Sequence, residues 1–302
     1  MVGRYRLRRV VRTVCALPSA VVTAAFLALL GAAAGLPWAL IPVAWLFCCG
    51  AYFYLAVDPA TSPAVMGYRR PTEAEQRVLG PAWDEVCYRA RADSSLITLW
   101  VRDSSAVNAM YGPAPDIAVT SAALEALKPD QLQAVLAHEY GHAVLGLRWA
   151  ERFVLLCGKP VSFVLGVLFG VVRFVADPIQ RFSRPMAVTV TWIWFVVVGI
   201  AVPVSPALVL GFAWAVTAAV LCYFQGLVVA WIRVLDELRC DRMAVDLRYG
   251  RELRKALELL ARSGRTGFPS ERGGDWVTFT ELRIYHILRR MDELRRMGRP
   301  DC

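Results

Sequence analysis

The sequence predicts a mainly α-helical membrane protein that combines two transmembrane helical hairpins with an α+β domain containing a small β-sheet. Of its 302 residues, 57% are hydrophobic, a larger share than in ordinary soluble domains. Charged residues are absent from two long stretches, residues 13–57 and residues 185–232. One helical crossing of a bilayer needs about 20 apolar residues, so each stretch is long enough for two crossings joined by a turn.

Charge and hydropathy divide the chain into six segments. A third apolar stretch is interrupted by Lys159 and Arg173, and its uninterrupted part is too short to cross a bilayer. We therefore expect it to form an interfacial or re-entrant segment. The segments are a basic leader at 1–12, the first hairpin at 13–57, the first part of the α+β domain at 58–152, the interfacial or re-entrant segment at 153–184, the second hairpin at 185–232 and the second part of the α+β domain at 233–302.

Arginines flank both uncharged stretches, and the formal net charge is +9. Arg12 and Arg69 lie near the ends of the first stretch, and Arg184 and Arg233 lie beside the ends of the second. Arginine at the cytoplasmic ends of spans is the positive-inside pattern, so we expect a multi-pass protein of the cell membrane whose termini and α+β domain are cytoplasmic. This distribution favours a lipid bilayer over nucleic acid as partner. A cleaved signal peptide ending near residues 31–34 is an alternative, but a second apolar run follows closely.

The charged segments predict six helices and two short strands. Strands are expected where β-branched and aromatic residues gather, and helix ends where proline, acidic residues or glycine bound a segment. The expected elements are a helix from Pro71 to about Ala92, a strand at Leu96–Val101, residues Val107–Met110 with a following Gly112-Pro113 turn, a strand at Ile117–Thr120, and helices at Ser121–Leu127, Pro129–Ala150, Arg233–Tyr249, Arg251–Arg262 and Thr280–Met297.

The most informative motif is H-E-Y-G-H at residues 138–142, which has the form H-E-x-x-H. Two histidines four residues apart lie on one face of a helix, about 6 Å apart along its axis. This spacing lets the imidazoles of His138 and His142 bind one zinc ion, while Glu139 can take a proton from bound water. The chain has only three histidines, so the pair predicts metal-assisted hydrolysis. A chance match on a surface helix is the alternative.

A catalytic zinc site needs three protein ligands and an open position for water. The remaining histidine, His286, is distant in sequence, so a carboxylate is the natural third ligand. Glu237 and Asp241 follow the second hairpin and share one helix face, so Glu237 could bind the metal while Asp241 accepts a hydrogen bond from a ligand imidazole. A solvated helix with salt bridges to Arg233 or Arg242 explains the two acids equally well.

Three segments, in this order, match one known family. The first is Asn108-Ala109, which precedes a short strand ending at Thr120. The second is L-Q-A-V-L-A-H-E-Y-G-H at residues 132–142, and the third is E-L-R-C-D at residues 237–241, where Cys240 replaces the usual alanine. On these segments the chain resembles the HtpX-like and CAAX prenyl protease family of integral-membrane zinc metallopeptidases.

The resemblance implies a gluzincin-like α+β catalytic domain that holds one Zn²⁺ ion per chain. It implies that His138, His142 and Glu237 are the zinc ligands. Glu139 is then the catalytic base, and Asp241 supports a ligand from outside the coordination shell.

The resemblance also implies a substrate site. Asn108 would hold the backbone of the substrate beside a sheet edge formed by residues 117–120. There an extended peptide can add as a strand and contact Ile117 and Val119.

The chain departs from the family at a late histidine, which commonly stands six residues before an arginine-isoleucine pair. Arg283-Ile284 fits the pair, but the earlier position is Val277. If that histidine stabilises the oxyanion, Arg283, Tyr285 or His286 could replace it, and we assign the role to Arg283.

The expected activity is hydrolysis of peptide bonds by a zinc-bound water that Glu139 activates. The resemblance implies membrane or unfolded polypeptides as substrates in quality control of membrane proteins, with prenyl-peptide trimming as a second option. One alternative is an intramembrane metalloprotease with Asp236 as third ligand, which the polar residues Lys128 and Asp130 before the motif disfavour. Another is a catalytically impaired membrane scaffold that retains a zinc site, which the intact Glu139 disfavours.

Overall fold

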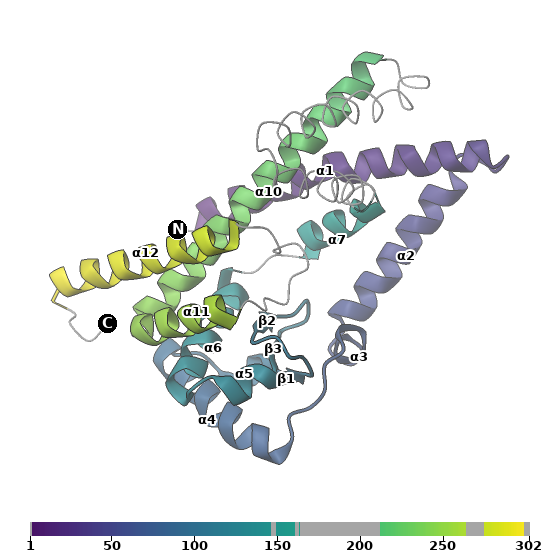
Figure 1. The fold of residues 1–302 in the computed structure, drawn as a ribbon. Helices are drawn as coiled ribbons and strands as arrows, with labels where there is room; N and C mark the ends of the chain where they lie inside the picture. Colours follow the sequence, from purple (N-terminus) through teal and green to yellow (C-terminus); the bar gives the residue numbers. More distant parts are fainter. Residues whose placement is uncertain (1, 146–148, 161–162, 164–211, 264–274, 299–302) are drawn as a thin grey trace, which may run out of the picture. The chain divides into compact units, whose positions relative to one another are not determined.

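The described residues of the computed structural model are mostly helical and include one three-stranded sheet (Figure 1). This confirms the mainly α-helical fold with a small β-sheet that the sequence predicts. The described residues are 2–145, 149–160, 163, 212–263 and 275–298.

The chain forms two compact units. Unit 1 comprises residues 1–53 and 147–231, and unit 2 comprises residues 54–146 and 232–302. The long helix α10 (Phe212–Asp246) contributes residues to both units.

Unit 1 also contains α1 (Val2–Ala33), most of α2 (Leu40–Val57) and α7 (Trp149–Cys157). The basic leader continues into the apolar part of α1 without a break in the helix. Among the described residues, α2 is the one helix long and apolar enough to cross a bilayer, and the apolar part of α1, Leu17–Ala33, is shorter. Residues 164–211, which include much of the predicted interfacial segment and the second hairpin, lie outside the described residues.

Polar and aromatic contacts hold the helices of unit 1 together. Ser19 N donates to Gln225 Oε1, and Gln225 Nε2 donates to Ser19 Oγ, each over 2.8 Å. These bonds tie α1 to α10 next to Pro18, which cannot donate a backbone hydrogen bond within α1. Phe53 of α2 meets Phe153 of α7 edge to face, with ring centroids 5.7 Å apart.

Unit 2 places a small sheet among helices. The elements are α3 (Ser62–Met66), α4 (Glu73–Ala90), a 3₁₀ turn (Ser94–Leu96), β1 (Thr98–Arg102), β2 (Ala109–Tyr111), β3 (Asp116–Thr120), α5 (Ser121–Ala126), α6 (Pro129–Leu145), α11 (Gly250–Ser263) and α12 (Asp275–Arg296). The predicted helices and the two predicted strands occur in order, and α3 and β2 are elements that the sequence did not predict. The motif helix is described as far as Leu145. Among the described residues, α11 and α12 follow α10 in this unit.

The sheet has the order β1-β3-β2, with β3 parallel to β1 and antiparallel to β2. The prediction that residues 117–120 form a sheet edge is therefore wrong, because β3 is the central strand. All five residues of β3 are buried, and Ile117 and Val119 have no exposed surface, so neither can contact a substrate. In the sequence, a strand buried on both faces is a short apolar run. Such a run does not indicate which strands pair with it.

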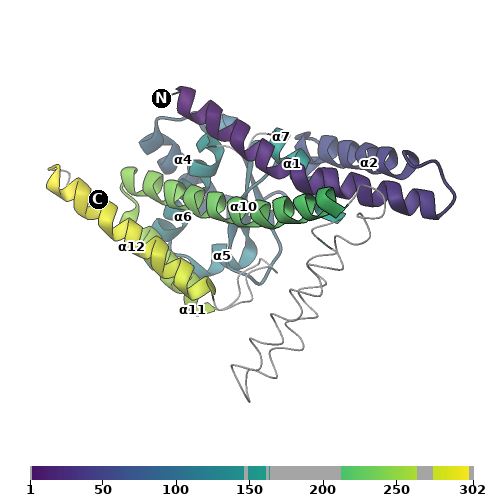
Figure 2. The ribbon, with the colours of Figure 1, turned by 90° about the horizontal axis from the view of Figure 1, so that it is seen from above.

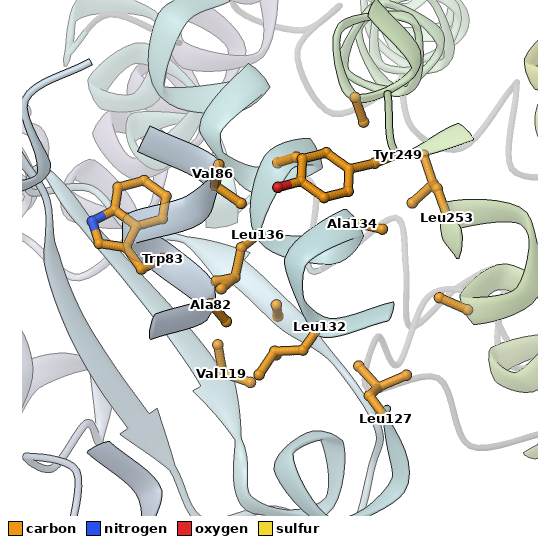
Figure 3. Close-up of a cluster of buried hydrophobic side chains, with 14 of the residues drawn as sticks. Ala82, Trp83, Val86, Val119, Leu127, Leu132, Ala134, Leu136, Tyr249 and Leu253 are labelled. Carbon is orange, nitrogen blue, oxygen red and sulfur yellow. The ribbon is translucent and has the colours of Figure 1, made fainter. Parts of the chain in front are cut away.

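A hydrophobic cluster at the centre of unit 2 anchors α6 (Figure 3). Leu132 and Leu136 of α6 are fully buried in it, and each such burial contributes roughly 1.5–3 kcal/mol. Ala134 and Ala137 belong to the same cluster, so α6 is buried around much of its circumference and is held in the interior of unit 2. The cluster also includes Trp83 and Val86 of α4, Val119 of β3, Tyr249 before α11 and Leu253 of α11.

The start of α4 is fixed by a capping box and an arginine. Thr72 Oγ1 accepts from Glu75 N, and Glu75 accepts from Thr72 N in return. Arg69 donates to both carboxylate oxygens of Glu75 over 2.7 Å and also binds Asp103 just after β1. The Arg69 hydrogen bonds lower the pKa of Glu75 from 4.5 to about 2.

Replacing Glu75 by glutamine should remove a stabilisation that depends on pH. Because the folded-state pKa is depressed, the wild-type carboxylate stabilises the fold above its ordinary pKa of 4.5 and loses this effect as the pH falls toward 2. The difference in thermal unfolding midpoint between wild type and Glu75→Gln should shrink over that interval. Glu73→Gln, which removes an acid of the same helical turn, is the control for the loss of one negative charge. A constant difference for Glu75→Gln across the interval would contradict the assignment.

Candidate metal centre

The site forms where α6 and the second part of α10 lie side by side (Figures 1 and 2). Their close approach occurs at Gly141, where a Cβ atom would lie 3.0 Å from Cys240 Cα and 3.1 Å from Cys240 Cβ. These distances are shorter than ordinary van der Waals contacts, so any side chain at residue 141 would push the helices apart. The absence of a side chain at Gly141 therefore lets the two helices bring their polar residues together.

Glu237 of α10 faces both histidines of α6. Its Oε2 atom lies 3.3 Å from His138 Nε2, and its Oε1 atom lies 3.3 Å from His142 Nε2. Burial by itself raises the pKa of Glu237, but the hydrogen bonds with the two histidines and the charge of Arg283 outweigh it and hold this pKa far below its usual range. Glu237 is therefore an ionised acid placed between two imidazoles.

Asp241, one helical turn further along α10, contacts the other nitrogen of the His138 ring. Asp241 Oδ1 lies 2.8 Å from His138 Nδ1, and the carboxylate is almost fully buried. Burial raises the pKa of Asp241, but the charge and hydrogen bonds of Arg283 and His138 lower it to about 2. The same carboxylates act on His138: burial lowers its pKa, whereas Asp241 and Glu237 raise it to about 10.

Arg283 reaches this cluster from α12. Its Nε and Nη2 atoms donate to the two oxygens of Asp241 over 2.8 and 2.7 Å, and its Nη1 atom lies 3.5 Å from Glu237 Oε2. Of the three residues that the sequence offers in place of the family histidine, Arg283 is the one that the structure brings into contact with the cluster. Tyr285 is largely exposed, and its ring packs against the ring of His286.

Glu139 lies beside the histidine pair and is 7% exposed. One ligand atom each from His138, Glu139 and His142 can be chosen so that all three lie within 4.8 Å of one another. Burial raises the pKa of Glu139, and the charges of the histidines and a backbone hydrogen bond with Tyr111 of β2 only partly offset this. Glu139 is thus an acid with a raised affinity for a proton at the edge of the cluster.

The cluster fits a divalent metal ion by charge and by donor type. Glu139, Glu237 and Asp241 are largely buried together with a single guanidinium group, that of Arg283. With neutral imidazoles, two negative charges have no counterpart, and a dication would neutralise them. Two imidazole nitrogens and one carboxylate are a donor set that zinc accepts. The Glu237 oxygens each lie near an Nε2 atom, whereas Asp236 pairs with Arg239 over 3.3 Å.

Asn108 is fixed by its own backbone at the start of β2. Its N–H donates to Thr120 Oγ1 and its carbonyl accepts from Thr120 N, each over 3.0 Å. Its side-chain Oδ1 accepts from Ala109 N over 2.9 Å. Asn108 therefore lies directly before the strand whose far end, at Tyr111, contacts Glu139.

The H-E-x-x-H motif on a buried helix, with acids facing its histidines, defines the class of zinc metallopeptidases. The model of Peptidase family M48 matches residues 90–279, which is well over half of the chain, so the chain belongs to this family. This finding confirms the family that the sequence resemblance predicts. Comparisons with the curated proteins and with the solved structures give no match.

Sequence reasoning missed one contact of the site. Cys240 Sγ lies 3.4 Å from His142 Nδ1. The spacing could have indicated this contact, because residues 237, 240 and 241 share one helix face. A buried cysteine is, however, usually interpreted as a small apolar residue.

Substituting Gly141 by alanine should weaken metal binding. The added Cβ would meet the backbone of Cys240, so α10 must shift and carry Glu237 away from the histidines. We expect the zinc affinity to fall about tenfold or more, as happens when the surroundings of metal ligands are disturbed. Competition with a chromogenic chelator measures this affinity.

Gly80→Ala in α4 is the matched control. Its Cβ would meet only the flexible side chain of Gln76, at 3.2 Å, so it should leave zinc affinity unchanged and stabilise the helix by about 0.5–1 kcal/mol. Equal zinc affinity for Gly141→Ala and wild type would show that the close approach is not needed for the site.

Proposed function

We propose that this chain is an integral-membrane zinc metalloendopeptidase in which His138, His142 and Glu237 hold the metal. The observation that carries the proposal is the placement of one ionised carboxylate, Glu237, against the Nε2 atoms of both motif histidines. Two imidazoles of α6 thus meet one carboxylate of α10. A carboxyl group with a raised pKa, Glu139, lies beside the histidines. Zinc, when bound, supplies Lewis acidity that acidifies a water molecule and polarises a peptide carbonyl.

Glu139 is the general base and acid in this proposal. Its buried carboxylate has a raised affinity for protons, so it accepts the proton of the attacking water and then delivers it to the amine that leaves. The backbone hydrogen bond with Tyr111 holds the carboxylate in place during both transfers.

Asp241 and Arg283 orient the ligands. Asp241 accepts from His138 Nδ1, which leaves Nε2 of that ring directed toward Glu237. Arg283 binds both oxygens of Asp241, and its remaining nitrogen faces Glu237. These bonds support a role for Arg283 in positioning the two acids, rather than the oxyanion role expected from the sequence.

We assign the substrate site to β2 instead of to the predicted strand at residues 117–120. The sheet order places β2 at an edge, and β2 runs from Ala109, directly after Asn108, to Tyr111, whose backbone contacts Glu139. An extended peptide that adds along residues 109–111 would bring its backbone past Glu139. We propose this edge, with Asn108 at its start, as the binding site for membrane or unfolded polypeptides in protein quality control.

The membrane assignment rests on α2 and on the charge pattern. α2 is long and apolar enough to span a bilayer, and arginines follow and precede the uncharged stretches. We propose two hairpins at 13–57 and 185–232, an interfacial or re-entrant segment at 153–184, and a cytoplasmic catalytic domain assembled from 58–152 and 233–302, with the leader 1–12 also cytoplasmic.

The two rival functions are less well supported. An intramembrane protease with Asp236 as ligand would need that residue to face the motif, but Asp236 pairs with Arg239 while its neighbour Glu237 faces the histidines. A scaffold with a structural metal has no use for a buried acid with a raised pKa beside the ligands, which is the environment of Glu139.

Replacing Glu139 by glutamine should abolish cleavage without removing the metal. Glutamine keeps the shape of the side chain but cannot take a proton, so cleavage of an unfolded model protein should fall by about 10²–10⁴-fold. Zinc content, measured by mass spectrometry of the purified protein, should stay at one ion per chain. Glu125→Gln, an exposed acid of α5, is the control and should cleave normally. Near-normal cleavage by Glu139→Gln would refute the assignment.

The proposed topology places the turn after α1 outside the cell and unit 2 inside it. Leu36→Cys in that turn should react with a membrane-impermeant maleimide in intact cells, above the background of the unmodified chain. Lys128→Cys, just before α6, should react only after the cells are permeabilised. Both positions are exposed, so burial does not limit labelling. Labelling of Lys128→Cys in intact cells would contradict the proposed orientation and indicate that unit 2 lies outside the cell.

A further inference from the structure

The two motif histidines have different partners behind their rings. Asp241 Oδ1 lies 2.8 Å from Nδ1 of His138, and Cys240 Sγ lies 3.4 Å from Nδ1 of His142. In both rings the opposite nitrogen, Nε2, faces Glu237. The His138 ring thus has a charged oxygen behind it, whereas the His142 ring has a sulfur atom.

We propose that Cys240 is a positioning residue that fixes the orientation and tautomer of His142 through a hydrogen bond to Sγ. This inference rests on the proposed function, because it takes Nε2 of His142 as a metal ligand. A neutral imidazole that binds a cation through Nε2 carries its hydrogen on Nδ1, so Nδ1–H must donate to an acceptor. Cys240 Sγ, which is fully buried and within range, is that acceptor.

The geometry of α10 makes Cys240 part of one functional face. Residues 237, 240 and 241 stand at positions i, i+3 and i+4, so their side chains project toward α6 together. Glu237 contacts both Nε2 atoms, Asp241 contacts one Nδ1 atom, and Cys240 contacts the other. Because Gly141 lets the Cys240 backbone approach α6 closely, the sulfur reaches the ring of the next residue, His142.

An alanine at position 240 would offer no acceptor to His142 Nδ1. A thiol accepts a hydrogen bond only weakly, so its loss should have a moderate effect. We expect the zinc affinity of Cys240→Ala to fall about tenfold, the lower end of the range for groups that orient metal ligands. Cys240→Ser offers a hydroxyl acceptor and should restore the affinity.

The test uses the full chain, purified in detergent, with zinc affinity measured by chelator competition. Cys87→Ala is the matched control, because Cys87 is a buried cysteine of α4 in the same unit and lies in the hydrophobic cluster. Cys240→Ala should lose affinity, while Cys240→Ser and Cys87→Ala should match wild type. Equal affinity for Cys240→Ala and wild type, or a Cys240→Ser protein as weak as Cys240→Ala, would overturn the proposal.

A spectroscopic readout separates positioning from simple packing. The chain has three histidines, so ¹⁵N spectra of zinc-loaded protein labelled at histidine contain only three rings. Cys240→Ala should move the Nδ1 signal of His142 and leave that of His286 in place. Cobalt substitution adds a second check: sulfur-to-cobalt charge-transfer absorption in wild type would show that Sγ binds the metal itself, which would overturn the hydrogen-bond role.

Failure of this inference and failure of the peptidase proposal give different results. A wild-type protein that binds zinc but cleaves no polypeptide removes the peptidase proposal and leaves the Cys240 comparison intact. If the wild-type protein cleaves normally and Cys240→Ala has the zinc affinity of wild type, only the proposed role of Cys240 is overturned. A wild-type protein that binds no zinc overturns both.

Discussion

The site depends on the close packing of α6 against α10 at Gly141. Every interaction between the motif and its partner acids crosses this contact, because the histidines belong to α6 and the residues that face them belong to α10. A metal site tolerates little displacement of its ligands, since donor atoms must lie about 2 Å from the ion. A single glycine without a side chain therefore sets how closely the two halves of the site approach, although it contributes no donor atom.

The same contact concentrates buried negative charge, and this charge must be balanced. Removing carboxylates from water is costly unless cations or hydrogen bonds compensate. Arg283 compensates in part through its two bonds to Asp241. Burial raises the pKa of Glu139, and Asp241 and Glu237 outweigh burial to raise the pKa of His138, so both groups favour their protonated forms. A bound dication would serve the same purpose. The electrostatics that make the cluster hold protons are therefore those that suit it to a metal.

The local signals of the sequence predicted most helices of unit 2 and the candidate ligands, but they gave neither the short helix α3 nor the strand β2 nor the order of the strands. The capping residue Thr72 and the turn glycines act within a few residues, so helix ends can be read from them. The position of β3 depends on which segments pair with it, and its five buried residues are compatible with several neighbours. Likewise, the depth at which Arg283 is buried depends on the packing of α12, which no residue near Arg283 specifies.

The contact between Glu237 and the histidine pair also constrains the membrane topology. Two groups that lie 3.3 Å apart are on the same side of any bilayer, so the proposed topology needs an even number of crossings between His142 and Glu237. The uncharged stretch at 185–232 is long enough for two crossings. In the proposed topology, the segment 153–184 does not cross the bilayer completely, and this assignment agrees with the charged residues Lys159 and Arg173 that interrupt its hydropathy.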